Sequence, residues 1–244
     1  LVSSSAASDV YKRQARVRNA NGNSFEVRVQ NPSDTPLSGY RVQYLVVEAG
    51  TYTQADHGIT MEAAKYQSSV TDVKGNWQAE TRSYQQSYAN PVVLGQVMSD
   101  NDSRWSQFWA RGSSRSTPPS ASNLAVGKHV GEDNNSTRVN ETIGYIVVEA
   151  GSGNANGQSY SAGVTAQNVR GQLESTPYLN SVGGQYSLGV VSSAGIRGGN
   201  GGWPVLYGAT PLANGQIGLG YDEDQISDSE RNHTTERVAY FLIQ

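Results

Sequence analysis

The sequence contains no cysteine, and none of its apolar runs approaches the length needed to cross a bilayer. Without cysteine, the chain can form no disulfide, no thiolate metal site and no cysteine nucleophile. Its 18 Lys and Arg residues are fewer than its 21 Asp and Glu residues, which gives a formal charge of -3 and no basic face for nucleic acid. We therefore expect neither a membrane span nor a nucleic-acid partner.

The residues that are abundant favour β-structure. The chain has 244 residues, of which 36% are hydrophobic, with 27 Gly and 14 Tyr. Val, Tyr and Thr suit pleated surfaces, and residues 25–30 (FEVRVQ) alternate apolar and polar side chains after an Asn-Gly turn signal. The run YIVVEAG at 145–151 is typical of a strand buried on both faces, whereas residues 112–123 predict an irregular loop and residues 61–65 are compatible with one helical turn. The sequence predicts an all-β fold.

Residues 1–14 (LVSSSAASDVYKRQ) differ from the rest of the chain. They lack the apolar core of a signal peptide and the alternation that begins directly afterwards. They resemble a translated adapter or cloning-junction sequence, and the alternative is a natural Ser-rich linker. We therefore exclude this non-native-looking leader from the fold assignment.

Three similar segments recur along the chain. Residues 39–52 (GYRVQYLVVEAGTY) are echoed at 141–153 (ETIGYIVVEAGSG) and at 235–244 (TERVAYFLIQ). Tyr44 and Tyr145 are 101 residues apart, and Tyr145 and Tyr240 are 95 apart. An interval near one hundred residues is the usual size of a β-sandwich domain. The sequence therefore predicts tandem antiparallel β-sandwich modules in which the tyrosine segment is the same closing strand.

Further segments recur between these anchors in the same order. Residues 91–99, 105–112 and 125–133 match residues 186–193, 203–209 and 217–224. The predicted modules are a partial first repeat at 15–52, a second repeat at 53–151 and a third at 152–244. Because a partial repeat leaves strand edges unpaired, we expect the chain to be a fragment of a longer protein.

The strand patterns PVVLGQVMS, FEVRVQ and YIVVEAG resemble the H-type lectin-like repeats of secreted and cell-surface proteins, especially large marine bacterial ones. The resemblance covers residues 15–244. It implies a six-stranded antiparallel sandwich, association as trimers, and binding of N-acetylgalactosamine-type sugars. No sugar-contact motif of the family matches a short motif here, so no residue role is carried over.

Three acidic turns are candidate calcium sites, because calcium prefers six to eight oxygen ligands. None has EF-hand spacing, and the alternative is that Asp and Asn residues simply form the turns through their own backbone. The last turn is the densest, and its carboxylates could converge if the loop folds back. The candidate ligands are Asp100, Asp102, Glu132, Asp133, Asp222, Asp224 and Asp228.

Two histidines lie in acidic surroundings ahead of the tyrosine strands. His129 and His233 are candidate ligand contacts, as is Arg231 beside His233. A catalytic interpretation makes Glu230 or Glu236 a general base next to a histidine. The alternative is an Arg–carboxylate bridge and a histidine that fixes the connecting loop.

Tryptophans are the remaining candidates, because their rings stack on the apolar faces of sugars. Trp105, Trp109 and Trp203 are assigned as candidate ligand contacts, and Trp77 belongs to the same group. Aromatic rings also fill sandwich cores. Trp105 and Trp109 are four positions apart, which places them on one face of a strand but does not show whether that face is covered. The sequence therefore leaves both ligand contact and core packing open.

We expect a non-catalytic, extracellular or cell-surface carbohydrate-binding or adhesion module, with glycans or cell-surface polysaccharide as partners and calcium as a candidate ion. Tandem copies would raise avidity for repeated glycans. One alternative is a purely structural spacer or matrix repeat. A glycoside hydrolase is the least favoured, because its only candidate acids, Glu132, Asp133, Asp222 and Glu223, lie on loops of separate repeats.

Overall fold

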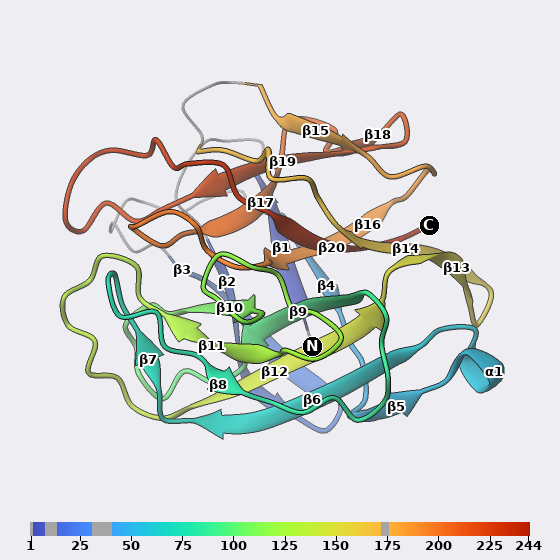
Figure 1. Ribbon diagram of the computed structural model, residues 1–244, viewed down its shortest axis with the longest axis horizontal. Helices are drawn as coiled ribbons and strands as arrows, with labels where there is room; N and C mark the ends of the chain where they lie inside the picture. The colour runs from blue at the N-terminus through green and yellow to red at the C-terminus, as the bar shows by residue number, and fades with distance from the viewer. Residues whose placement is uncertain (1, 8–13, 31–40, 172–175) are drawn as a thin grey trace.

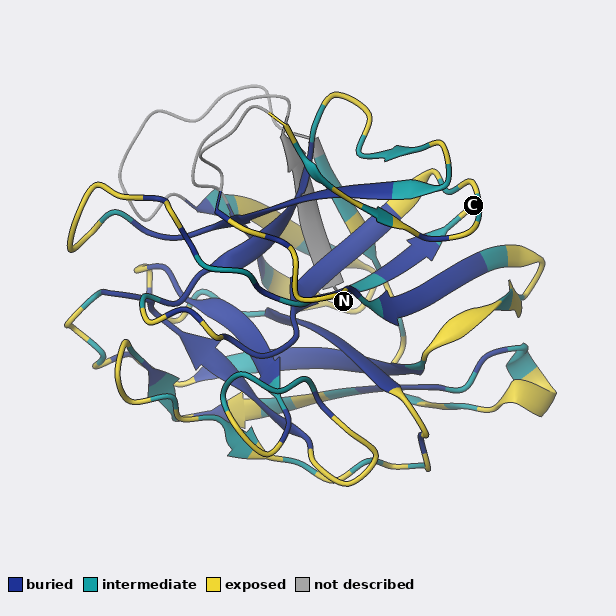
Figure 2. Ribbon diagram, turned by 45° about the horizontal axis from the view of Figure 1, so that its top comes forward, coloured by how far each residue is buried: buried dark blue, intermediate teal, exposed yellow. Residues whose placement is uncertain are grey.

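The computed structural model describes residues 2–7, 14–30, 41–171 and 176–244. Within these residues the chain consists of β-strands joined by loops, with one short helix, α1 (Gln54–His57), at the edge of the molecule (Figure 1). The all-β prediction is confirmed. Most strands lie in four small sheets, and the central strands of these sheets are buried while the connecting loops are exposed (Figure 2).

Residues 50–149, here called the middle segment, form two of the sheets. The inner middle sheet has the antiparallel order β5-β6-β12-β9, and the outer middle sheet joins β10 and β11 to the short strands β7 and β8. The bounds are β5 (Gly50–Tyr52), β6 (Met61–Ser68), β7 (Thr71–Asp72), β8 (Glu80–Thr81), β9 (Pro91–Val97), β10 (Gln107–Arg111), β11 (Ala125–His129) and β12 (Glu141–Glu149).

Residues 151–243, here called the C-terminal segment, repeat this pattern. The inner C-terminal sheet has the order β13-β14-β20-β16, and the outer C-terminal sheet joins β17 and β19 to β15 and β18. The bounds are β13 (Gly151–Ala155), β14 (Gln158–Val164), β15 (Tyr178–Ser181), β16 (Leu188–Ser193), β17 (Trp203–Tyr207), β18 (Leu212–Ala213), β19 (Gln216–Asp222) and β20 (Val238–Ile243).

The described residues before position 50, here called the N-terminal segment, contribute four strands. β2 (Gln14–Asn21) and β3 (Ser24–Gln30) form a hairpin, while β1 (Val2–Ala7) pairs antiparallel with β4 (Arg41–Leu45) and parallel with β17. β1 lies inside the leader that was excluded from the fold assignment. Strands pair through their backbone groups, which do not require alternating apolar and polar side chains. The sequence pattern therefore did not predict this strand.

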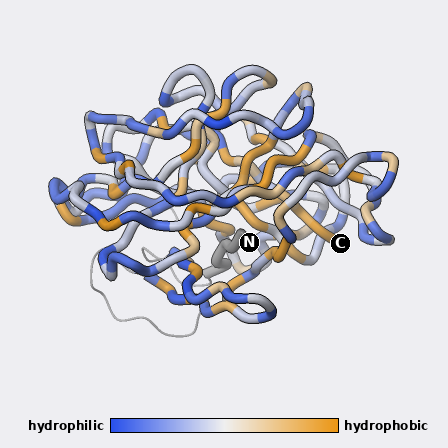
Figure 3. Tube along the Cα trace, turned by 90° about the horizontal axis from the view of Figure 1, so that it is seen from below, coloured by the Kyte–Doolittle hydropathy of each residue, from blue (hydrophilic) through white to orange (hydrophobic). Residues whose placement is uncertain are grey.

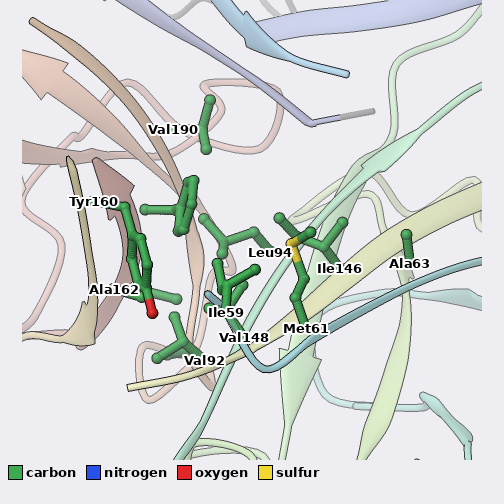
Figure 4. Close-up of a cluster of buried hydrophobic side chains, with 13 residues drawn as sticks. Ile59, Met61, Ala63, Val92, Leu94, Ile146, Val148, Tyr160, Ala162 and Val190 are labelled. Carbon is green, nitrogen blue, oxygen red and sulfur yellow. The ribbon is translucent and has the colours of Figure 1, made fainter. Parts of the chain in front are cut away.

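Four hydrophobic clusters separate the sheets, which together have a four-bladed, propeller-like arrangement. The central core lies between the two inner sheets and includes Met61, Leu94, Ile146 and Tyr160 (Figure 4). One cluster fills each segment between its inner and outer sheets, and a fourth joins the two outer sheets. Hydrophobic stretches are correspondingly concentrated in the interior of the chain trace (Figure 3).

The tyrosine segments at 145 and 240 have matching positions in the two inner sheets. β12 lies between β6 and β9, and β20 lies between β14 and β16. β4, which carries Tyr44, has β1 on one side only among the described strands. The strands β1, β9 and β16 pack against one another at the centre of the molecule.

Several local predictions can be checked directly. The hairpin at Asn21 and Gly22 is confirmed, with Gly22 at a φ of 56°. The strand of YIVVEAG is buried on both faces, because Ile146 reaches the central core while Tyr145 reaches the core of the middle segment. Residues 112–123 are irregular, as expected. The helical turn considered at residues 61–65 is wrong, because these residues belong to strand β6.

Candidate functional site

A buried glutamate holds the loop that follows β16. Glu236 lies just ahead of β20, and its carboxylate accepts hydrogen bonds from the backbone N–H groups of Arg197 (2.9 Å) and Gly198 (2.6 Å). Because two adjacent backbone donors point at one carboxylate, this loop has a single defined position.

His233 links Glu236 to a second buried carboxylate. Its Nε2 lies 2.8 Å from Glu236 Oε1, its Nδ1 lies 2.7 Å from Glu223 Oε2, and its ring stacks on Tyr221 at 4.7 Å. A neutral imidazole donates from one nitrogen only, so two accepting carboxylates favour the protonated ring. We call His233, Glu223 and Glu236 the acid–histidine cluster.

The pKa values in this cluster follow from burial and pairing. Burial alone lowers the pKa of His233, but the hydrogen bonds to Glu223 and Glu236 outweigh it and raise that pKa to about 9. Burial raises the pKa of Glu223 to about 7, against the opposing effect of His233. The cluster therefore holds a proton near neutral pH.

An open polar cleft of about 470 Å³ lies over this cluster. Its walls come from the loop carrying Arg115 in the middle segment and from loops of the C-terminal segment. We call it the polar cleft, and its lining residues are Arg115, Arg197, Gly198, Gly199, Asn200, Glu223, Glu230, Asn232, His233 and Thr234.

The charged groups of the polar cleft are held in place from behind. Arg115 donates to the carbonyl of Gly198 (3.0 Å) and lies 4.3 Å above the ring of Trp77, while Arg197 donates to the hydroxyl of Thr234 (3.0 Å). Glu223 is 1% exposed, and its Oε1 has no hydrogen-bond partner among the described residues. The cleft thus presents guanidinium donors next to a fixed carboxylate acceptor.

The middle segment contains a buried glutamate at the matching position. Glu141 stands four residues before Tyr145, as Glu236 stands four before Tyr240. It accepts the backbone N–H groups of Asn101 (3.2 Å) and Asp102 (2.9 Å). Its cation is Arg16 of β2, whose Nη2 donates at 2.5 Å.

The three candidate tryptophans lie in the interior. Trp105 and Trp203 pack edge to face at 5.5 Å between the outer sheets, and Trp109 packs against Trp77 at 6.3 Å. Trp109 and Trp203 are 0% and 1% exposed, so neither offers a ring face to a sugar. The structure corrects the ligand-contact assignment toward core packing, because a neighbouring sheet covers these rings.

His129 lies apart from the polar cleft lining, although the sequence placed it with His233. It is buried, and its Nε2 lies 3.1 Å from the carbonyl of Gly202 while its Nδ1 accepts the N–H of Gly131 (3.2 Å). Burial lowers its pKa to about 4, so the ring is neutral with the proton on Nε2. Its contacts fix a loop.

The candidate calcium ligands are each engaged separately. Arg104 holds Asp102, Arg231 holds Asp222, and Lys74 holds Glu132 at 2.6 Å. Among the described residues no three or more His, Asp or Glu side chains are grouped so as to hold a metal ion. Other partners are Arg28 for Asp100, Arg138 for Asp133, the Glu132 N–H for Asp224 and the Glu230 N–H for Asp228.

The same pairing describes the four acids considered for glycoside hydrolysis. Glu132, Asp133 and Asp222 have Lys or Arg partners, and Glu223 has His233. Arg231, the other candidate beside His233, donates through Nε and Nη2 to Asp222, at 2.9 and 2.7 Å. The Arg–carboxylate bridge that the sequence offered as the alternative to a catalytic site near His233 is therefore present.

Sequence reasoning did not single out Arg115, Arg197 or Glu141. The first two lie in loops without a motif, and only their spatial neighbours reveal them. Glu141 could have been found, because aligning the tyrosine segments places it opposite Glu236.

Comparison with known proteins gives little beyond this geometry. No family model and no solved structure matches the chain. The chain is 26% identical over 243 residues to Halomucin of Haloquadratum walsbyi. The aligned region covers 98% of this chain and 2% of Halomucin. The chain thus spans a small fraction of that relative. No helix in the described part of the chain is long and apolar enough to cross a membrane.

Proposed function

We propose that this chain is a non-catalytic extracellular carbohydrate-binding module and that the polar cleft holds the sugar. The observation that carries the proposal is Glu223, a buried carboxylate whose Oε1 lacks a partner in a cleft flanked by two arginines. A buried acceptor without a partner is costly, and a ligand hydroxyl would satisfy it.

The chemistry of the cleft suits a polyhydroxylated ligand. Arg115 and Arg197 supply hydrogen-bond donors, while Glu223 and Glu230 supply acceptors. Sugar hydroxyls both donate and accept, so such a mixed lining can satisfy them. Recognition in this cleft would be polar, because its described lining contains no Trp, Tyr or Phe.

The proposal includes a duplicated sandwich architecture. In each of the middle and C-terminal segments an inner and an outer sheet enclose a core, and the inner sheets share one strand order. The resemblance to H-type lectin-like repeats implies trimers of such units. We propose that three repeats of one chain take the place of three subunits, which the mutual packing of β1, β9 and β16 supports.

Extracellular placement is part of the same proposal. It is supported by the similarity to a protein that carries the name Halomucin. Tandem binding units would raise avidity for a repetitive glycan at a cell surface.

A glycan array followed by calorimetry tests the proposal, with and without calcium because the acidic turns predicted a calcium site. We expect saccharide binding that falls about tenfold or more in Arg115→Ala and Arg197→Ala, since each removes charged donors. Arg18→Ala is the matched control, because the Arg18 side chain is partly exposed and pairs with Glu26 away from the cleft.

A purely structural spacer is the second candidate. It is favoured by the burial of Trp105, Trp109 and Trp203, which leaves no aromatic binding platform among them. The absence of saccharide binding in both calcium conditions, together with concentration-dependent association in light scattering, would replace the first proposal with this one.

A further inference from the structure

β4 differs from the strands that carry the other two tyrosine anchors. β12 and β20 each have a strand on both edges, β6 and β9 for one and β14 and β16 for the other. β4 is paired on one edge with β1, and no described strand lies on its other edge. Among the described strands, none occupies beside β4 the place that β6 and β14 occupy in the inner sheets.

The backbone geometry of β12 shows which groups face that open edge. The N–H of Glu149 donates to the carbonyl of Thr60 at 3.0 Å on the β6 side, whereas Thr142 accepts from Met98 at 2.7 Å on the β9 side. Odd-numbered residues of β12 therefore face β6. By the tyrosine alignment, their counterparts in the N-terminal segment are Val42, Tyr44 and Val46, and we expect the N–H and C=O groups of these residues to face the open edge.

The central core is incomplete at the same place. Met61 lies opposite Val148 in the β6–β12 pair, and Tyr160 lies opposite Ile243 in the β14–β20 pair. The counterpart of Val148 and Ile243 is Val47, which also packs against the central core.

No described strand places a side chain opposite Val47. A cavity of about 330 Å³ lies there instead, and its lining includes Leu45, Val47, Met61, Tyr160, Phe241 and Ile243. In the close-up of the core, Met61 and Tyr160 come from different strands (Figure 4).

A second cavity, of about 210 Å³, lies along the same stretch of chain. It is bounded by Val46, by Phe25 of the β2–β3 hairpin and by Tyr145 of β12. A strand beside β4 would point alternate side chains into the two cavities, because successive side chains of a strand face opposite ways. Tyr44 and Val46, which lie on this stretch, are 55% and 62% exposed.

We infer that the open edge of β4 is a strand-acceptor site, and that its occupant is a β-strand of another copy of this repeat. β6 (MEAAKYQS) and β14 (QSYSAGV) fill two of the three equivalent places in this chain. The occupant would carry an apolar residue opposite Val47, as Met61 and Tyr160 do for Val148 and Ile243. A relative in which this chain covers 2% of the length has room for further copies. Binding by strand addition uses main-chain hydrogen bonds for affinity and side-chain pockets for register.

A synthetic peptide of residues 60–69 (TMEAAKYQSS), added to the full chain, tests the inference. We expect saturable binding by calorimetry and slower hydrogen exchange at the amides of Val42, Tyr44 and Val46. The control peptide has the same composition, but its Met and Ala residues are shifted by one position so that they face the other side of the strand. It should bind at least about tenfold more weakly, because a one-residue shift turns each apolar side chain away from the core.

Lysine substitutions at the β4 edge provide a second test of the strand-acceptor site. Tyr44→Lys and Val46→Lys should weaken peptide binding about tenfold or more, because a charged edge resists strand addition. Val139→Lys, at a residue 55% exposed outside this edge, is the matched control, and unchanged melting temperatures show that all three variants fold. The inference is overturned if the peptide does not bind, if the edge variants bind it as well as the control does, or if the β4 edges of two chains pair with each other instead of accepting a β6-type strand.

Discussion

Glu141 and Glu236 occupy the same place in two parts of the molecule, but their charges are balanced in different ways. Each carboxylate accepts two consecutive backbone N–H groups, from the loop after β9 in one case and from the loop after β16 in the other. Glu141 takes its cation from Arg16, 125 residues away in the N-terminal segment. Glu236 takes its cation from His233, three residues before it.

This difference shows that the loop-holding carboxylate is the repeated feature, whereas the counter-ion is local to each segment. Arginine stays charged at any pH a protein experiences, but histidine titrates. The stability of the middle segment is therefore expected to depend on its contact with the N-terminal segment, whereas that of the C-terminal segment is expected to depend on pH.

The largest expected effect comes from removing the permanent cation. Arg16→Met should lower the free energy of unfolding by about 3–5 kcal/mol, because it leaves the buried Glu141 carboxylate without compensation. Urea denaturation followed by tryptophan fluorescence measures this. Arg28→Met is the control, since Arg28 is half-exposed and its ion pair with Asp100 should contribute about 1 kcal/mol or less. Equal losses in the two variants would contradict the role given to Arg16.

A smaller effect is expected at the matching carboxylate. Glu236→Gln should lower the free energy of unfolding by about 1.5–3 kcal/mol, because an amide accepts the N–H groups of Arg197 and Gly198 less strongly than a carboxylate does. Glu230→Gln is the control, because Glu230 is exposed. Hydrogen exchange should show the loss first at Arg197 and Gly198. Faster exchange at Asn101 and Asp102 instead would mean that the two segments do not respond separately.

A third expected effect is a dependence of stability on pH that belongs to the C-terminal segment. The pKa of His233 is about 9 in the folded chain against an ordinary 6.5, so its stabilisation is fully present below pH 6.5 and is lost as pH rises through about 9. Ionisation of Glu223 also lowers the stability as pH rises from 4.5 to about 7, because burial raises the pKa of this carboxyl. Denaturation at pH 6 and pH 9 should show a loss of stability in the wild type that is reduced in His233→Gln. An unchanged slope in that variant would remove His233 as its source.

Local patterns in the sequence predicted the strands well. The alternation in residues 25–30, the Asn-Gly turn before them and the apolar run after Tyr145 each gave the observed element. The helical turn considered at residues 61–65 does not form. Met, Glu, Ala and Lys favour helices in isolation, but pairing of β6 with β12 on one edge and β5 on the other decides their conformation.

The candidate site was predicted less well. An even spacing placed Trp105 and Trp109 on one face, but nothing local says whether another sheet covers that face. The pairing of Trp105 with Trp203 joins residues almost a hundred positions apart. The partners of the acidic turns, such as Lys74 for Glu132, are likewise distant in sequence.

The sequence by itself determined the all-β class, the main turns and the repeated tyrosine strand, because these depend on short-range side-chain patterns and backbone preferences. Only the tertiary structure decided that the tryptophans are covered, that Arg16 reaches Glu141, and that Arg115 meets Glu223 and His233 at one cleft. Burial and charge pairing depend on which distant segments meet, and contact between sheets is not encoded in the period of any one strand.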